Sequence, residues 1–272
     1  MLRSLWTAAS GMIAQQNNVD TIANNLANVN TTGYKSETAE FKSLLYQELQ
    51  TKTTSSNGDT KPIGAAVGLG VRNSTITSHF KQGAFQDTGE QFDIAIQGDG
   101  FFQLRNLDGN PVYTRNGDFM LAINSDGDFQ LSNAQGLAVM DTEGNPIIFD
   151  EDTNISGVSI DLNGRVVMEN AAGVSTDTGI QLGIYQFTNP SGLTKLADTL
   201  YEESAASGVA LQEAENPNLS KSTLKTGYLE MSSVQVADEM VSLIVAQRAY
   251  ELNSKAITTS DEMMQTANNL KS

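Results

Sequence analysis

Apolar residues recur every seven positions near the start of the chain, at Leu5, Met12, Val19 and Leu26. The alternate positions of the same repeat hold Leu2, Ala9, Gln16 and Ala23. This a/d spacing is typical of an amphipathic helix that packs along a second helix in a coiled coil. The pattern stops at Asn30, Thr31, Thr32 and Gly33, where glycine and β-branched residues end a helix. We therefore expect a coiled-coil helix over residues 1–30.

The same period returns at the other end of the chain, at Val236, Leu243, Tyr250, Ile257 and Met264. Met240 and Ile244 widen this stripe. Ser232 and Gln235 have the spacing of a capping box, in which side chains satisfy the free N–H groups at a helix start. We expect a helix from about 233 to 270, within a segment 232–272 that pairs with the N-terminal helix.

Between the repeats, glycine turn signals separate short apolar runs. Asp108-Gly109, Asn116-Gly117 and Asn163-Gly164 are such signals, and the runs include residues 92–97, 101–104 and 183–187. This spacing predicts antiparallel hairpins in a sandwich or barrel. The expected fold class is α+β: terminal helices in a coiled coil, and a central antiparallel β-rich outer domain. We place that domain at 76–210, with a connecting segment at 31–75 and a return connection at 211–231.

Charge and composition narrow the classes of function. The formal net charge is −16, and because residues 1–30 are neutral and 233–272 carry −2, the middle carries −14. Such a surface repels nucleic acid and anionic lipid. The chain has no cysteine and a single histidine, His79, which we interpret as an ordinary strand or loop residue. No apolar run has the length of a membrane span, and the N-terminus lacks the pattern of a cleaved signal peptide.

The predicted helices carry Asn, Gln, Ser and Thr where an exposed coiled coil would normally carry charges. Two interpretations remain open from composition. Neutral faces suit packing between identical helices, where like charges would meet themselves, and they equally suit a two-helix hairpin with a solvated polar face.

A search for chemistry finds no catalytic, cofactor or metal motif. The segment Asn124-Ser-Asp-Gly-Asp128 departs from the EF-hand pattern and is interpreted as a hairpin turn. Residues 98–102 lack the following helix of a dinucleotide loop, and the glycines at 64, 68 and 70 lack a P-loop lysine. We expect no enzyme activity and no cofactor.

Three segments resemble one known family. Residues 23–35, Ala-Asn-Asn-Leu-Ala-Asn-Val-Asn-Thr-Thr-Gly-Tyr-Lys, and residues 227–255 resemble the N- and C-terminal signatures of flagellar rod and hook proteins. Residues 92–102 and 113–119 resemble the start of their β-domain. The motif positions carried over are Asn24, Asn25, Asn28, Gly33, Tyr34, Gln247, Arg248 and Asn253. Within the family, the opening residues 2–12, the chain length and residues 44–70 resemble distal rod subunits.

The resemblance implies a structural role in the flagellar basal body. It implies a helical homopolymer whose terminal helices form an inner tube, exported by the flagellar type III system without a cleaved signal. The rod would cross the periplasm, transmit torque, and contact hook protein, proximal rod proteins and surrounding ring or bushing proteins. By analogy, residues 46–63 would clamp neighbouring subunits and stiffen the rod. The heptad spacing itself predicts that Leu243 and Ile257 are buried between helices, so Leu243→Asp would abolish polymerisation while the β-domain stays folded. The alternatives are another axial subunit (proximal rod or hook type), a secreted β-domain binding module, and a hydrolase with an unrecognised carboxylate pair.

Overall fold

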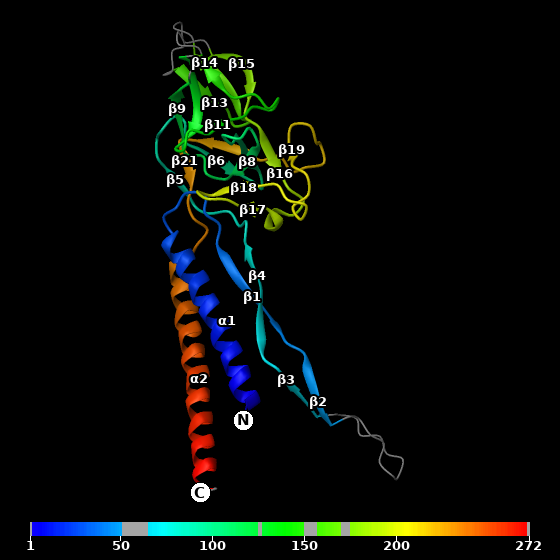
Figure 1. Ribbon diagram of the computed structural model, residues 1–272. Coiled ribbons are helices and arrows are strands. Elements are labelled where there is room, and N and C mark those ends of the chain that lie inside the picture. Colours follow the sequence, from blue (N-terminus) through cyan, green and yellow to red (C-terminus); the bar gives the residue numbers. More distant parts are fainter. Residues whose placement is uncertain (1, 51–64, 125–126, 150–156, 170–174, 271–272) are drawn as a thin grey trace. The chain divides into compact units, whose positions relative to one another are not determined.

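Two long helices run side by side, one from each end of the chain (Figure 1). The computed structural model describes residues 2–50, 65–124, 127–149, 157–169 and 175–270. The chain forms two compact units, which are described separately. The helical unit comprises residues 1–27, 37–78 and 235–272, and the β unit comprises residues 28–36 and 79–234.

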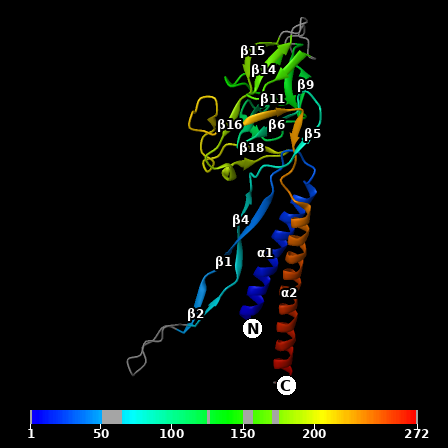
Figure 2. The ribbon, with the colours of Figure 1, turned by 180° about the vertical axis from the view of Figure 1, so that it is seen from behind.

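The helical unit pairs α1 (Leu2–Ala27) with α2 (Val236–Asn269). Both views show the two helices together, with the two chain ends at the same end of the pair (Figures 1 and 2). A two-stranded ribbon of β1 (Glu37–Ser43) and β4 (Val71–Ser78) packs against α1. The ribbon continues into a second antiparallel pair, β2 (Tyr46–Gln50) and β3 (Ala65–Gly68).

The C-terminal end of α1 and both ends of α2 differ from the limits expected from the sequence. α1 stops at Ala27, and turns follow before Thr31, so the helix does not reach residue 30. α2 begins at Val236 and ends at Asn269. The capping-box prediction is wrong: Gln235 is the N-cap without a side-chain bond to the helix. The Ser232 hydroxyl instead accepts a hydrogen bond from the Val234 N–H, because the helix begins only at Val236.

The β unit is antiparallel throughout its described strands. One sheet runs in the order β12-β10-β11-β7-β8-β18-β17, with β9, β16 and β19 attached beside it. A second sheet has the order β13-β14-β15, and two strand pairs, β20-β6 and β21-β5, complete the unit. The strands not yet given bounds are β5 (Phe85–Asp87), β6 (Ile94–Gln97), β7 (Phe101–Arg105), β8 (Pro111–Thr114), β9 (Phe119–Ile123), β10 (Phe129–Asn133), β11 (Ala138–Val139), β12 (Ile148–Phe149), β13 (Val158–Ile160), β14 (Arg165–Glu169), β15 (Ser175–Gln181), β16 (Ile184–Gln186), β17 (Thr194–Lys195), β18 (Leu200–Glu202), β19 (Leu211–Gln212), β20 (Thr223–Thr226) and β21 (Tyr228–Glu230), with a 3-10 turn η2 (Pro190–Gly192).

Alternation along β7 creates two cores, one on each face of the sheet. Phe102 and Leu104 point into the larger core, which also takes Ile96 from β6 and Leu224 from β20. Phe101 points the other way, into an aromatic cluster with Tyr113, Phe187 and Tyr201. These aromatic rings meet edge to face, for example Tyr113 and Phe187 at 4.9 Å between centroids.

Most of the glycine turn signals close hairpins. Gly109 lies between β7 and β8 and Gly164 between β13 and β14, both with positive φ. Asn116-Gly117 is the exception, because β8 and β9 on either side of it do not pair with each other. A Cβ on Gly117 would lie 1.7 Å from the Ile94 carbonyl oxygen, so this glycine permits close backbone contact rather than a hairpin.

The observed fold class is α+β, with a helix at each end of the chain and an antiparallel β-rich body between them in sequence. Residues 211–230 contain three strands, and β20 and β21 pair with β6 and β5. No helix in the described part of the chain is both long and apolar enough to cross a membrane.

Candidate assembly surface

Three contacts set α1 and α2 antiparallel within the helical unit. Ser4 Oγ lies 3.4 Å from Ser260 Oγ, near the start of α1. At the other end, Asn25 Nδ2 donates to Glu239 Oε1 at 3.0 Å. Midway, a Cβ added to Gly11 would lie 2.9 Å from Asn253 Nδ2, so this glycine lets the motif residue Asn253 approach the α1 backbone.

The α1 stripe is only partly as predicted. Leu5, Met12, Val19 and Leu26 are all half-buried, while Gln16 and Ala23 are exposed. The buried residues of α1 are Ala8, Ala14, Thr21, Ile22 and Asn25. Ala8 and Ile22 lie three residues after Leu5 and Val19, rather than three before. Gln16 and Ala23, at the alternate positions of the repeat, thus lie outside the packed face of one copy, because a heptad pattern alone leaves the side of the second row undetermined. The Leu2 side chain lies outside the described set.

The α2 stripe divides in the same way. Leu243, Ile257 and Met264 are half-buried, whereas Val236, Met240 and Tyr250 are 42%, 53% and 43% exposed. The fully buried residues of α2 are Ala246 and Ser260. Sequence reasoning missed these two because small residues carry no hydrophobic-moment signal, although they permit close helix approach.

Asn25 fixes the start of both β1 and α2. Its side chain is fully buried; Nδ2 donates to the Glu37 carbonyl oxygen at 2.8 Å and Oδ1 accepts from the Glu37 N–H at 2.9 Å. The second Nδ2 hydrogen reaches Glu239. Burial raises the pKa of the Glu239 carboxyl, the Asn25 bond lowers it, and Asp238 raises it again. Only an amide side chain supplies this combination of donors and acceptor.

The other motif residues have different surroundings. Gly33 has φ +69° and donates its N–H to the Glu230 carbonyl oxygen, and Tyr34 accepts from the Ser233 N–H. Asn28 accepts a hydrogen bond from the Thr31 hydroxyl. Asn24, Gln247 and Arg248 are exposed in the helical unit. The packing of one copy does not explain why these three exposed side chains belong to the family motif.

Large apolar side chains cover the surface of α2 that faces away from α1. Val241, Ile244, Val245 and Leu252 are 61%, 56%, 63% and 68% exposed. On α1, Trp6 is 75% exposed. A helix that is apolar around its whole circumference is normally buried. We take these outward faces of α1 and α2 as the candidate assembly surface.

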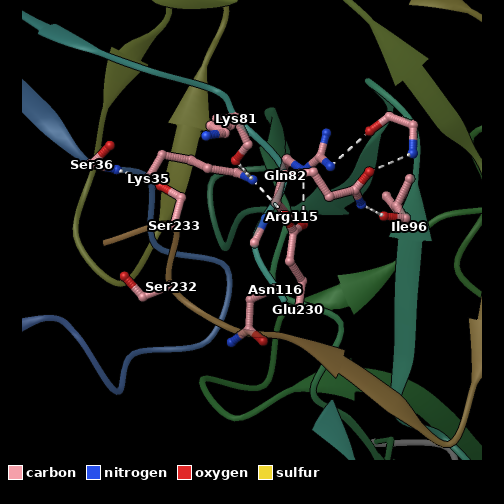
Figure 3. Close-up of polar contacts among 12 residues, drawn as sticks. Lys35, Ser36, Lys81, Gln82, Ile96, Arg115, Asn116, Glu230, Ser232 and Ser233 are labelled. Atoms are coloured by element: carbon pink, nitrogen blue, oxygen red, sulfur yellow. Dashed lines mark hydrogen bonds and ion pairs between the residues drawn. The ribbon is translucent and has the colours of Figure 1, made fainter. Parts of the chain in front are cut away.

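A cluster of charged side chains is buried within the β unit (Figure 3). The Glu230 carboxylate accepts from Lys35 Nζ at 2.6 Å, from the Gly83 N–H at 2.8 Å and from Arg115 Nε at 3.2 Å. Lys35, Arg115 and Glu230 are each 1% exposed. Arg115 also donates to the carbonyl oxygens of Gly100 and Gly98, at 3.0 and 2.8 Å.

The cluster has more positive than negative charge, because two cations share one carboxylate. The pKa of Lys35 is lowered to about 8, first by burial and then by the nearby Arg115, and Glu230 only partly offsets these two effects. Lys35 Nζ has a further acceptor in the Lys81 carbonyl oxygen at 2.9 Å. All three residues lie within the family-like segments, but a signature motif does not show that its charges are buried together.

The residues weighed for chemistry lie in turns and strands. Gly127 donates its N–H to the Asn124 carbonyl oxygen with φ +96°, which confirms the predicted turn. The His79 N–H donates to the Ser36 carbonyl oxygen. Within the described ranges, no three acidic or histidine side chains are placed to hold a metal ion. Of the glycines at 64, 68 and 70, Gly64 lies outside those ranges, within the segment 51–64.

Comparisons with known proteins cover both ends and the middle. The model "Flagella basal body rod protein" matches residues 5–35, "Flagellar hook protein FlgE/F/G D1 domain" matches 95–168, and "Flagellar basal body rod FlgEFG protein C-terminal" matches 225–270. The chain is 43% identical to the flagellar basal-body rod protein FlgG of Borreliella burgdorferi, over 100% of this chain and 99% of that one. It is 39% identical to the FlgG protein of Bacillus subtilis over the full length of both. The flagellar hook-basal body complex protein FlhP of Bacillus subtilis is 32% identical, again over both full lengths.

Proposed function

The chain belongs to the FlgG family of flagellar basal-body rod proteins and is a structural subunit of the distal rod, and we propose that it polymerises through its helical unit. In this proposal the outward faces of α1 and α2 pack against other copies. The polymer is a rigid helical tube that transmits motor torque to the hook. The role is mechanical and non-enzymatic.

The observation that carries the proposal is the apolar circumference of α2 near its N-terminal end. Leu243 and Ala246 face the helix pair, while Val241, Ile244 and Val245 lie on the opposite side and are more than half exposed. At about 25 cal/mol per Å² of apolar area, covering such side chains is strongly favourable. Additional copies of the same helices provide that cover, so α1 and α2 form the coiled-coil layer of the tube.

The two outward faces differ, which favours an open polymer over a closed dimer. The α1 face carries Trp6 and Ile13, and the α2 face carries Val241, Val245 and Leu252. When two different faces of one chain meet, the contact is heterologous, and repetition gives a ring or a helical filament. A rod subunit requires the second outcome.

The finer features of the proposal come from the family. The partners are other copies along the rod, hook protein and proximal rod proteins at its ends, and ring or bushing proteins around it. The location is the basal body, in the part of the rod that crosses the periplasm, after export without a cleaved signal. We propose that the segment 46–63 clamps neighbouring copies, although residues 51–63 of it lie outside the described residues. Deletion of the segment should make the shaft measurably more flexible.

Polymerisation is tested with a pair of neighbouring substitutions. Val245→Asp places a charge on the outward face of α2, so the monomer should keep its helix content while filament formation is lost. Leu243→Asp places the charge on the half-buried face toward α1, and should lower monomer helicity as well. Sedimentation and electron microscopy at rising concentration measure filaments, and circular dichroism measures helix content.

The outcomes separate the proposal from its alternatives. A wild-type chain that stays monomeric at all concentrations, or a Val245→Asp variant that still forms normal filaments, would contradict the proposal. The 32% identity to a hook-basal body complex protein keeps another axial subunit as the second candidate. Restoration of motility in a bacterium that lacks its own distal rod subunit, but not in one that lacks another axial subunit, distinguishes these two.

A further inference from the structure

A small polar cavity lies between α1 and the β1–β4 ribbon, within the helical unit. Its volume is about 350 Å³, and its lining includes Asn17, Asp20 and Asn24 from α1, Glu37 from β1, and Asn73 from β4. We call this cavity the α1 notch. Every lining group that carries formal charge is a carboxylate, so the notch suits a cationic side chain.

Asn73 adds an independent sign that the notch is incomplete in one copy. Its side-chain oxygen is buried and has no hydrogen-bond partner among the described residues. A buried carbonyl oxygen without a donor raises the free energy of the fold by about 1–3 kcal/mol. Asp20, in contrast, is exposed on α1 and forms no ion pair within the described chain. A cation with several N–H groups would satisfy both.

Arg248 is a cation of that kind without a structural role in its own copy. Its side chain is 74% exposed, and among the described residues its ion pair is with Glu251 on the same helix, at 3.0 Å, where the Glu251 side chain is 63% exposed. Such surface pairs contribute less than about 1 kcal/mol, so Arg248 can exchange partners at small cost. The guanidinium carries five N–H donors in a planar fork, enough for a carboxylate and an amide oxygen together.

Arg248 also lies in the middle of a second apolar row on α2. Val241, Val245, Arg248 and Leu252 follow the alternating four- and three-residue spacing of a heptad, and Met263 lies 11 residues beyond Leu252. The four apolar residues are 50% to 68% exposed. On α1, Trp6, Ile13, Asp20 and Ala27 are spaced by seven and all exposed. Each row therefore has apolar ends and one charged residue between them.

The spacing of the two rows matches when the helices are antiparallel. Copies in a helical polymer point the same way along its axis, so α2 of one copy runs antiparallel to α1 of the next, as it does within one copy. With Asp20 opposite Arg248, Trp6 lies about 21 Å away along α1 and Met263 about 22 Å away along α2. In the other direction, Ala27 and Val241 are each about 10 Å from the charge pair.

We propose that Arg248 of one copy binds in the α1 notch of a second copy, between Asp20 and Asn73, and sets the register of the two outward faces. This inference rests on the proposed function, since the occupant is another copy of this chain. It assigns a role to two exposed motif residues, because Arg248 is the ligand and Asn24 lines its site. The apolar rows supply the binding affinity between copies. The charge pair sets the alignment, because a shift of one helix along the other would separate Arg248 from Asp20.

The test is a charge exchange measured by the critical concentration for polymerisation. Asp20→Arg and Arg248→Asp should each raise that concentration by about tenfold or more, and the double variant should return to within about threefold of wild type. Both positions are exposed, so circular dichroism should be unchanged. Lys195→Asp, an exposed charge reversal in the β unit, is the matched control and should have little effect.

Cross-linking identifies the occupant directly, because the chain contains no cysteine. A copy with Asp20→Cys is mixed with a tagged copy with Arg248→Cys, and a short bis-maleimide is added. A mixed dimer should dominate over both homodimers, and over the dimer formed when Lys195→Cys replaces Arg248→Cys.

The outcomes are distinguishable. If wild-type protein forms filaments but neither single reversal changes the critical concentration, or the double variant is no better than the singles, the notch proposal fails while self-assembly stands. Mixed dimers no more abundant than the control would also overturn it. If wild-type protein forms no filaments, the proposed function and the notch proposal fail together.

Discussion

Glu230 is the only carboxylate that pairs with Lys35 and Arg115 in the described part of the chain. Removing one member of a buried charge group costs about 3–5 kcal/mol, because the remaining charge loses its partner. Here the removal of Glu230 would leave two cations buried. The β unit can therefore fold stably only when residues 33–36, 83 and 230 come together around the shared carboxylate.

The pKa of Lys35 gives a direct pH test. It is about 8 in the folded protein against 10.5 in the unfolded chain, so the unfolded state binds more protons between these values. The free energy of unfolding should therefore rise with pH, by about 2 kcal/mol from pH 7.5 to 9.5. Burial raises the pKa of Tyr113 to about 12, and this group opposes the rise only above pH 10.

Chemical denaturation at the two pH values measures this effect. Lys35→Met removes the titrating group, so its free energy of unfolding should be nearly flat over the same interval. Equal pH dependence in the wild type and in Lys35→Met would show that Lys35 is not the source.

Thr199 has an unfavourable backbone conformation. It lies in the turn between β17 and β18 with φ +60°, next to Asp198 with φ +58°. A β-branched residue rarely adopts this region, whereas glycine does so freely. Thr199→Gly should raise the free energy of unfolding by about 1 kcal/mol, measured by urea denaturation. Thr194→Gly, within β17, should instead lower it, and a stabilising effect at both positions would contradict the strain argument.

At the scale of elements, the heptad repeats predicted both helices and much of the face by which they pair. Leu5, Val19 and Leu243 are indeed half-buried. The spacing did not identify Ala8, Ala246 or Ser260, since the closest helix approach depends on small side chains rather than apolar ones. It also could not separate the face toward α1 from the face toward other copies, because both are apolar.

The difference between neighbouring positions on α2 is testable. Ala246 is 1% exposed and Val245 is 63% exposed. Ala246→Leu should force the helices apart and destabilise the monomer by about 1–3 kcal/mol. Val245→Leu, one residue away on the outward face, should leave monomer stability within about 0.5 kcal/mol. Thermal unfolding followed at 222 nm compares the two, and similar effects would mean that the helix faces are assigned wrongly.

The β unit illustrates a different limit of sequence reasoning. The turn signals and apolar runs predicted hairpins such as β7–β8 and β13–β14, where the partners are adjacent in sequence. They could not predict the pairing of β6 with β20, because about 130 residues separate the two strands and local patterns carry no information on such partners. The Lys35–Glu230 contact was missed for the same reason.

At the scale of the whole molecule, negative charge is concentrated in one unit. The residues of the β unit carry a net −14, and those of the helical unit carry −2. Copies in a polymer bring their β units close together, so their mutual repulsion opposes assembly. The nearly neutral helical unit is suited to close packing, whereas the acidic β unit is suited to contact with solvent or with basic partners.

Salt should therefore promote polymerisation. The Debye length falls from about 30 Å at 0.01 M to about 8 Å at 0.15 M ionic strength, so repulsion between β units is screened while apolar contacts persist. We expect the critical concentration to fall by about threefold or more over this range, measured by sedimentation. A rise would indicate that charge attraction, not helix packing, dominates assembly.

The pairing of β20 with β6 and of β21 with β5 also has a consequence for synthesis. These strands come from residues 223–230, directly before α2, and Leu224 fills the core beside Ile94 and Ile96. A nascent chain that ends before residue 223 has most of its strands, but it lacks β20 and β21 and therefore cannot complete the pairing with β6 and β5. A product that terminates before residue 223 would therefore remain open to proteolysis, and we expect the β unit to become protease-resistant only after the ribosome has passed residue 230.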